Sequence, residues 1–167
     1  MGVGSLATHV GFVPHDRAHP NYVAVRDMVR RVCDKCASNG QTFALETGQE
    51  PAATLNQFLT DVDRPNLKIN FDPANMILYG TGDPIEALEV VKSQVVSVHC
   101  KDGDWPAGAG QLGVERPLGK GAVGMPRFIA KLKEIGYTGA LTIEREVHGD
   151  EQRRDILAAV ELLRSLV

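Results

Sequence analysis

Short apolar runs alternate with longer stretches of helical period along the whole chain. Five apolar or β-branched runs predict strands, and each is followed by a loop and a helix. They occupy residues 6–10, 42–46, 67–71, 95–99 and 140–144. Strands that alternate with helix-length stretches are typical of repeated βα units, whose strands pair in parallel. The pattern therefore predicts an α/β chain built on a parallel sheet.

Helix boundaries and buried helix faces are also visible in the sequence. Asp83, Pro84 and Glu86 form a capping-box pattern that marks the start of one helix. Other helices are predicted at 21–37, from Pro51, at 126–135 and at 151–166. Three- and four-residue spacing predicts that the first and last helices bury one face each. The positions expected on those faces are Val25, Met28, Val29, Val32, Cys33, Cys36, Ile156, Leu157, Val160 and Leu163.

Composition narrows the class of protein. The 167 residues are 43% hydrophobic and 23% charged, which is typical of a globular domain. A net charge of −3 provides no positive field for a polyanion, so nucleic acid is not an expected partner. The longest apolar runs fall far short of the roughly 18 residues of a membrane span. Three cysteines and no secretion signal favour a cytoplasmic protein, with Cys33 and Cys36 packed in the core.

Metal-ligating residue types recur where the predicted strands end. Glu46, Asp72, His99 and Glu144 lie at or directly after four of the strands. The carboxyl ends of parallel strands meet at one edge, where ligands bind. Each residue taken singly could be an exposed loop position. Recurrence favours a site instead, because isolated buried carboxylates cost several kcal/mol each unless a cation pairs with them.

Four segments, taken in order, resemble a known family. Residues 44–50, 70–75, 98–102 and 141–146 are similar to the sugar phosphate isomerase/epimerase family of xylose isomerase-like TIM barrels, and residues 117–121 resemble its glycine turn. The resemblance covers nearly the whole chain. It implies one incomplete (β/α) TIM-barrel domain over residues 1–167, with strands that correspond to about strands four to eight of the barrel.

The resemblance also implies a function. Glu46, Asp72, His99 and Glu144 would bind a divalent metal ion, and Glu46 and Glu144 would act as the acid/base pair. Oxygen-rich ligands with one imidazole suit Mn²⁺, Mg²⁺ or Co²⁺, and Zn²⁺ is a further candidate. The expected reaction is isomerisation or epimerisation of a sugar or sugar phosphate through an enediolate, which the metal stabilises while the glutamates move the proton.

Five further residues are expected to contact the substrate. They are His9, Asn75, Lys101, Asp102 and Trp105. His9 resembles a strand-four histidine of the family, and a structural histidine is an open alternative. Asn75 stands where some epimerases have a substrate-binding histidine. Lys101 and Asp102 either reach sugar hydroxyls or open the loop, and Trp105 either covers a sugar ring or packs on the barrel rim.

The remaining segments carry weaker signals. Residues 103–124 form the one long glycine-rich loop that we expect, and long loops in compact domains are often functional. Arg145 and Glu146, next to Glu144, predict a structural ion pair with each other.

The resemblance begins at strand four, so three βα units are missing from the expected barrel. A TIM barrel has about 250 residues, and five parallel strands cannot close one. The exposed edges predict a homo-oligomer or a partner chain that completes the barrel. A split gene product, a dimerising half-barrel and a mis-called start remain open. Two alternative functions are a non-catalytic fragment or subunit and an endonuclease IV-like DNA-repair enzyme, which the acidic charge disfavours.

Overall fold

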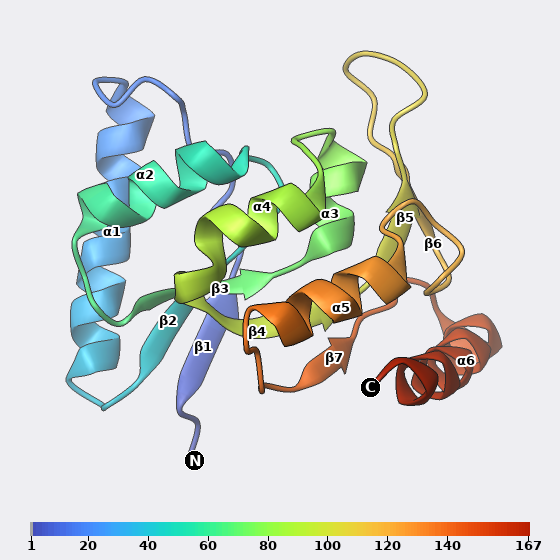
Figure 1. The fold of residues 1–167 in the computed structure, drawn as a ribbon. Helices are drawn as coiled ribbons and strands as arrows, with labels where there is room; N and C mark the ends of the chain where they lie inside the picture. Colours follow the sequence, from blue (N-terminus) through green and yellow to red (C-terminus); the bar gives the residue numbers. More distant parts are fainter. Residues whose placement is uncertain (1) are drawn as a thin grey trace.

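Five parallel strands form the main sheet of the computed structural model, which describes residues 2–167 (Figure 1). The strands are β1 (Ser5–Thr8), β2 (Thr42–Glu46), β3 (Leu67–Phe71), β4 (Val95–Cys100) and β7 (Leu141–Ile143). Their order in the sheet, β1-β2-β3-β4-β7, follows the chain, and every pair is parallel. The five predicted strands are confirmed, and the curled sheet is that of an incomplete TIM barrel.

Helices connect the strands and pack along one side of the sheet (Figure 1). They are α1 (Pro20–Ala37), α2 (Ala52–Val62), α3 (Pro73–Tyr79), α4 (Pro84–Val91), the short 3₁₀ helix η1 (Lys92–Gln94), α5 (Met125–Glu134) and α6 (Gly149–Leu166). Asp83 caps α4 as predicted, because its carboxylate accepts hydrogen bonds from the N–H groups of Ile85 and Glu86. Within residues 2–167, no helix combines the length and apolar character that crossing a membrane requires.

The core lies between the sheet and this helical layer. Phe71 of β3 stacks on Phe128 of α5, with ring centroids 6.0 Å apart. Cys33 and Cys36 of α1 are buried with free thiols, which confirms their predicted place in the core. On the central strands, the side chains that face the helices, such as Leu45, Ile69 and Val98, are buried.

Two predicted core positions are wrong. Met28 of α1 is 54% exposed and Leu157 of α6 is 60% exposed. Both helices flank the edges of the sheet, where β1 is exposed along its whole length and β7 has only three residues. The helical period identifies an apolar face, but it carries no information on how far the sheet extends beneath that face.

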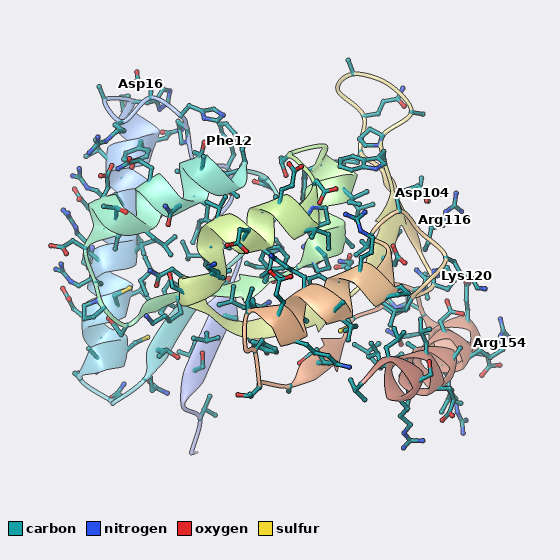
Figure 2. All side chains as sticks on the ribbon, viewed as in Figure 1. Phe12, Asp16, Asp104, Arg116, Lys120 and Arg154 are labelled. Atoms are coloured by element: carbon teal, nitrogen blue, oxygen red, sulfur yellow. The ribbon has the colours of Figure 1, made fainter. Side chains whose placement is uncertain are left out.

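The predicted long loop contains a hairpin. β5 (Asp102–Asp104) and β6 (Val114–Arg116) pair antiparallel, with Asp102 opposite Arg116. Arg116 Nε lies 2.6 Å from Asp104 Oδ2 across the hairpin, and Figure 2 labels both side chains at its outer side. Three-residue strands are too short to show a two-residue period, so the sequence pattern did not reveal them.

Asp102 fastens the base of this hairpin to the glycine turn. Its buried carboxylate accepts hydrogen bonds from the backbone N–H groups of Gly103 (2.9 Å), Gly119 (2.9 Å) and Val123 (3.1 Å). Both carboxylate oxygens are therefore engaged by the backbone. The expected contact of Asp102 with substrate stays a prediction.

Gly121 lies so close to this junction that a side chain should disrupt it. A Cβ at Gly121 would stand 2.4 Å from Asp102 Oδ1 and 2.5 Å from Gly103 N. We expect Gly121→Ala to lower the free energy of unfolding by about 1–3 kcal/mol, as overpacking does. Urea denaturation measures the change. Gly4→Ala is the control, because no atom lies within 4 Å of its added Cβ; equal losses in both variants would contradict the expectation.

Candidate metal centre

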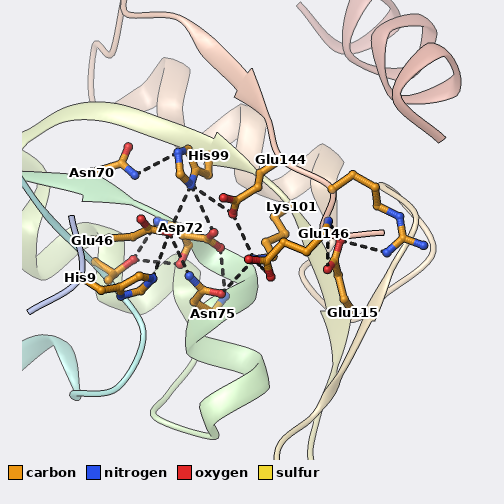
Figure 3. A network of polar contacts seen from close by, with 12 residues as sticks. His9, Glu46, Asn70, Asp72, Asn75, His99, Lys101, Glu115, Glu144 and Glu146 are labelled. Carbon is orange, nitrogen blue, oxygen red and sulfur yellow. Dashed lines mark hydrogen bonds and ion pairs between the residues drawn. The ribbon is translucent and has the colours of Figure 1, made fainter. Parts of the chain in front are cut away.

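Four side chains at the strand ends converge on one point (Figure 3). Glu46 ends β2, Asp72 follows β3, His99 lies near the end of β4, and Glu144 follows β7. One ligand atom from each of them lies within 4.8 Å of the other three. Parallel pairing brings the carboxyl ends of the strands to the same edge, and so these residues, distant in sequence, are neighbours in space.

His99 stands at the centre of the three carboxylates. Its Nδ1 atom lies 3.2 Å from Glu46 Oε1, 3.5 Å from Asp72 Oδ2 and 3.3 Å from Glu144 Oε2. The preceding and following residues on β4, Val98 and Cys100, are buried in the helix-covered core. Alternation along the strand thus directs His99 to the inner face, where the carboxylates lie.

Two polar atoms in this cluster are buried without a hydrogen-bond partner: Asp72 Oδ2 and His99 Nδ1. The other Asp72 oxygen, Oδ1, accepts a hydrogen bond from the Asn75 N–H at 2.9 Å and caps α3. An unsatisfied buried polar atom costs about 1–3 kcal/mol, more when the group is charged. A divalent cation beside Asp72 Oδ2 and His99 Nδ1 would satisfy both atoms, so the residues present fit a metal ion.

The second ring nitrogen of His99 has a different environment, which the sequence analysis missed. Asn70 Nδ2 lies 3.1 Å from His99 Nε2, and the Ser97 hydroxyl donates to Asn70 Oδ1 at 2.7 Å. Cation binding through Nδ1 leaves the ring proton on Nε2 and requires the amide oxygen of Asn70 to face it. The Ser97 hydroxyl can accept a hydrogen bond from the turned amide.

Electrostatics in the cluster favour a positive charge at its centre. Burial by itself would lower the pKa of His99, but the nearby carboxylates of Asp72, Glu144 and Glu46 outweigh it and raise the pKa to about 11. The pKa of Glu144 is lowered to about 2, chiefly by the nearby imidazole of His99. Burial raises the pKa of Asp72. In the metal-free protein, the proton on His99 supplies the positive charge that a cation would supply.

Two of the expected substrate contacts adjoin the cluster. Asn75 Nδ2 donates to Glu46 Oε1 at 3.1 Å. His9 Nε2 lies 3.4 Å from the same oxygen, and its side chain is half exposed. Both residues line the approach to Glu46, and their contact with a substrate stays a prediction.

Lys101 and Trp105, two further expected contacts, differ from each other in their surroundings. Lys101 is buried, and its ammonium donates to Glu144 Oε2 at 3.0 Å, to Glu146 Oε2 at 2.7 Å and to Asn75 Oδ1 at 3.4 Å. Trp105 follows β5 and is 45% exposed. Within the part of the chain that the structure describes, no hydrogen bond joins Trp105 to the cluster. Its expected role is untested.

The predicted ion pair between Arg145 and Glu146 is wrong. Arg145 Nη1 lies 2.9 Å from Glu115 Oε1, and Arg145 Nε lies 2.7 Å from Asp155 Oδ2. Glu146 pairs with Lys101 instead. Consecutive side chains in extended backbone point to opposite faces, so these two neighbours find separate partners.

The chain is similar to several known proteins. A xylose isomerase domain protein from Planctomyces limnophilus is 48% identical, with a TM-score of 0.93 over 97% of this chain and 59% of that one. An uncharacterized protein of Methanocaldococcus jannaschii is 28% identical over 95% of this chain and 55% of its own length. A D-tagatose 3-epimerase-like protein, at 22% identity and a TM-score of 0.75, covers 98% of this chain and 61% of that one, and shares the fold.

The chain thus spans a little over half the length of these relatives. A family model described as xylose isomerase-like TIM barrel matches residues 1–166. The TIM-barrel fold of this family agrees with the strand order and the helical layer of the structure. The chain belongs to the family of xylose isomerase-like TIM barrels.

Proposed function

We propose that this chain carries the metal centre and the acid/base pair of an isomerase or epimerase that acts on a sugar or sugar phosphate. The observation that supports it most is the pair of buried, unpartnered atoms, Asp72 Oδ2 and His99 Nδ1, which face the carboxylates of Glu46 and Glu144. Family membership and the fold shared with a D-tagatose 3-epimerase-like protein support an enzyme of this general kind.

Glu46, Asp72, His99 and Glu144 would hold the metal ion. When bound, a divalent ion (Mn²⁺, Mg²⁺, Co²⁺ or Zn²⁺) supplies a Lewis acid that polarises the substrate carbonyl. Glu46 comes from β2 and Glu144 from the segment after β7, on opposite sides of β3 and β4 in the sheet. This strand order supports the proposal that the two carboxylates approach a substrate from opposite sides, as transfer of a proton between neighbouring carbons requires.

We propose that the half-exposed imidazole of His9 and the amide of Asn75 contact the substrate. Both already contact Glu46 Oε1, so a sugar hydroxyl that binds beside that oxygen would meet both groups. Asp102 and Trp105 belong to the hairpin after β4. We propose that they act from the rim, Asp102 by holding the glycine turn and Trp105 by covering bound sugar.

The β1 edge of the sheet needs further polypeptide to complete a barrel around a substrate. β1 is exposed along its length, and an open groove of about 380 Å³ beside it is lined partly by Leu6, Met28, Val32 and Cys36. Because the solved xylose isomerase domain relative is matched over 59% of its length, we propose that strands equivalent to its unmatched part cover this edge. A second copy of the chain or another subunit could supply them, or they could lie elsewhere in a longer chain.

Deuterium exchange tests the proposed function. The protein, freed of metal and reloaded with each ion in turn, is incubated in D₂O with a panel of ketoses and ketose phosphates. Proton NMR then reports deuterium uptake at the carbon next to the carbonyl. We expect metal-dependent uptake with at least one sugar. If the metal binds and no sugar exchanges, the second candidate is favoured: a non-catalytic subunit, which the open sheet also suggests.

Asn70→Ala should weaken metal binding without removing a ligand. The substitution takes away the group that orients His99 through Nε2, and loss of such partners typically costs 10–100-fold in metal affinity. Titration calorimetry with Mn²⁺ measures the change. Asn56→Ala, on the exposed face of α2, is the control and should bind as the parent does. Equal affinity in both variants would rule out the orienting role of Asn70.

A further inference from the structure

Two pairs of side chains face each other where the chain leaves β4 and β7. His99 and Lys101 are two positions apart, as are Glu144 and Glu146, and such pairs lie on one face of extended backbone. The register pairs Cys100 with Ile143, which sets the two pairs side by side. His99 Nδ1 lies 3.3 Å from Glu144 Oε2, and Lys101 Nζ donates to that same oxygen at 3.0 Å (Figure 3). Glu144 Oε2 is therefore shared by the cluster and Lys101.

The ammonium of Lys101 is fully engaged. Only 2% of the side chain is exposed. Its three N–H donors meet three oxygens, on Glu144, Glu146 and Asn75. A substrate hydroxyl could bind Lys101 only by displacing one of these partners. The three N–H groups of Lys101 are thus taken up by these oxygens, and none is left to bind a ligand.

Glu144 lies directly beyond the last residue of β7, where its N–H donates to the Cys100 carbonyl at 3.2 Å, and side chains hold the residues that follow it. Arg145 points to the opposite face and forms ion pairs with Glu115 of β6 and Asp155 of α6. Glu115 Oε1 also accepts the N–H of Glu146 at 3.0 Å. These contacts secure the backbone that follows Glu144, and none of them reaches the Glu144 carboxylate, which Lys101 contacts.

We propose that Lys101 is a positioning residue that holds the Glu144 carboxylate toward the metal centre, rather than a contact to the substrate. The inference rests on the proposed function, in which Glu144 is a metal ligand. A positive charge so near the centre repels a cation. If Lys101 acts only through its charge, its removal would therefore tighten metal binding. If Lys101 positions Glu144, its removal would weaken metal binding.

Co²⁺ binding to the full chain tests the sign of this effect. We expect Lys101→Met to raise the Kd for Co²⁺ by 10–100-fold, in line with the loss of a group that orients a ligand. We also expect its visible Co²⁺ spectrum to change toward that of Glu144→Gln. Lys101→Arg, which keeps the charge and the donors, should restore most of the affinity and the parent spectrum. An unchanged or lower Kd in Lys101→Met would overturn the proposal.

A matched control exists on the surface. Lys131 also forms ion pairs with two carboxylates, those of Glu89 and Glu134, each at 2.7 Å. Lys131→Met should leave the Kd for Co²⁺ within about twofold of the parent, since its charge lies away from the centre. Circular dichroism checks that each variant folds. If Lys101→Met does not fold, the shorter and neutral Lys101→Gln takes its place, with the same two outcomes.

Glu144→Gln separates failure of the inference from failure of the proposed function. If it weakens Co²⁺ binding and Lys101→Met does not, Glu144 is a ligand that needs no positioning by Lys101, and only the inference fails. If Glu144→Gln leaves both the Kd and the Co²⁺ spectrum unchanged, Glu144 is not a ligand. The proposed metal centre then fails along with the inference.

Discussion

Glu144→Gln is expected to lower the rate of sugar isomerisation by about 10²–10⁴-fold, the usual contribution of a positioned acid or base. Glutamine keeps the size of the side chain but cannot take up and return a proton. The nearby imidazole of His99 and the hydrogen bond from Lys101 keep the Glu144 carboxylate ionised, with its pKa lowered to about 2 in the metal-free protein. The substitution thus removes a charged group that can accept the proton.

Initial rates of deuterium uptake measure the effect, with the sugar that the panel identifies as substrate. Glu161→Gln is the matched control, because Glu161 lies exposed on α6 and pairs with Arg164. It should retain the parent rate. Retention of both the exchange activity and the Co²⁺ affinity by Glu144→Gln would refute the proposed acid/base and ligand roles of Glu144.

The strand ends explain why so much of the candidate centre was visible in the sequence. In a parallel sheet, one carboxylate or imidazole at each strand end is enough to build a cluster, and Glu46, Asp72, His99 and Glu144 obey that rule. β2 and β3 are largely buried runs rich in apolar residues, so their positions followed from the local pattern. β2 and β3 have the predicted bounds.

The supporting residues were harder to predict because their partners are set by pairing between strands. Asn70 near the end of β3 reaches His99 on β4, and Lys101, directly after β4, reaches Glu146 beyond β7. The spacing by two positions, in His99 and Lys101 and in Glu144 and Glu146, was the available signal. Reading it requires the neighbour order of the strands, which local periodicity does not give.

The burial of helix residues at the edges of the sheet could not be predicted from the sequence pattern. Met28 lies on an apolar stripe of correct period, and its exposure reflects an edge strand, β1, that nothing within the described residues covers. Period alone assigns a residue to a face of its helix. Which residues pack against that face depends on the tertiary structure of the sheet.

Affinity for Mn²⁺ is expected to rise by about tenfold per pH unit between pH 6 and pH 8.5, more than 100-fold in total, because binding displaces one proton from His99. The sequence alone placed this dependence near pH ~6.5, the ordinary range of histidine. The carboxylates of Asp72, Glu144 and Glu46 raise the pKa of His99 to about 11 in spite of its burial. The imidazole therefore stays protonated in the metal-free protein throughout the measured range.

The raised pKa of His99 explains why metal affinity increases with pH. A raised pKa in the folded state stabilises the metal-free protein fully below pH ~6.5, and this stabilisation is lost as pH rises toward about 11. Metal competes with that proton, so each unit of pH lowers the cost of binding. Calorimetry in two buffers of different ionisation enthalpy counts the protons released. A plateau above pH 7.5 would mean that His99 titrates as a free histidine, and no pH dependence at all would mean that it is not a ligand.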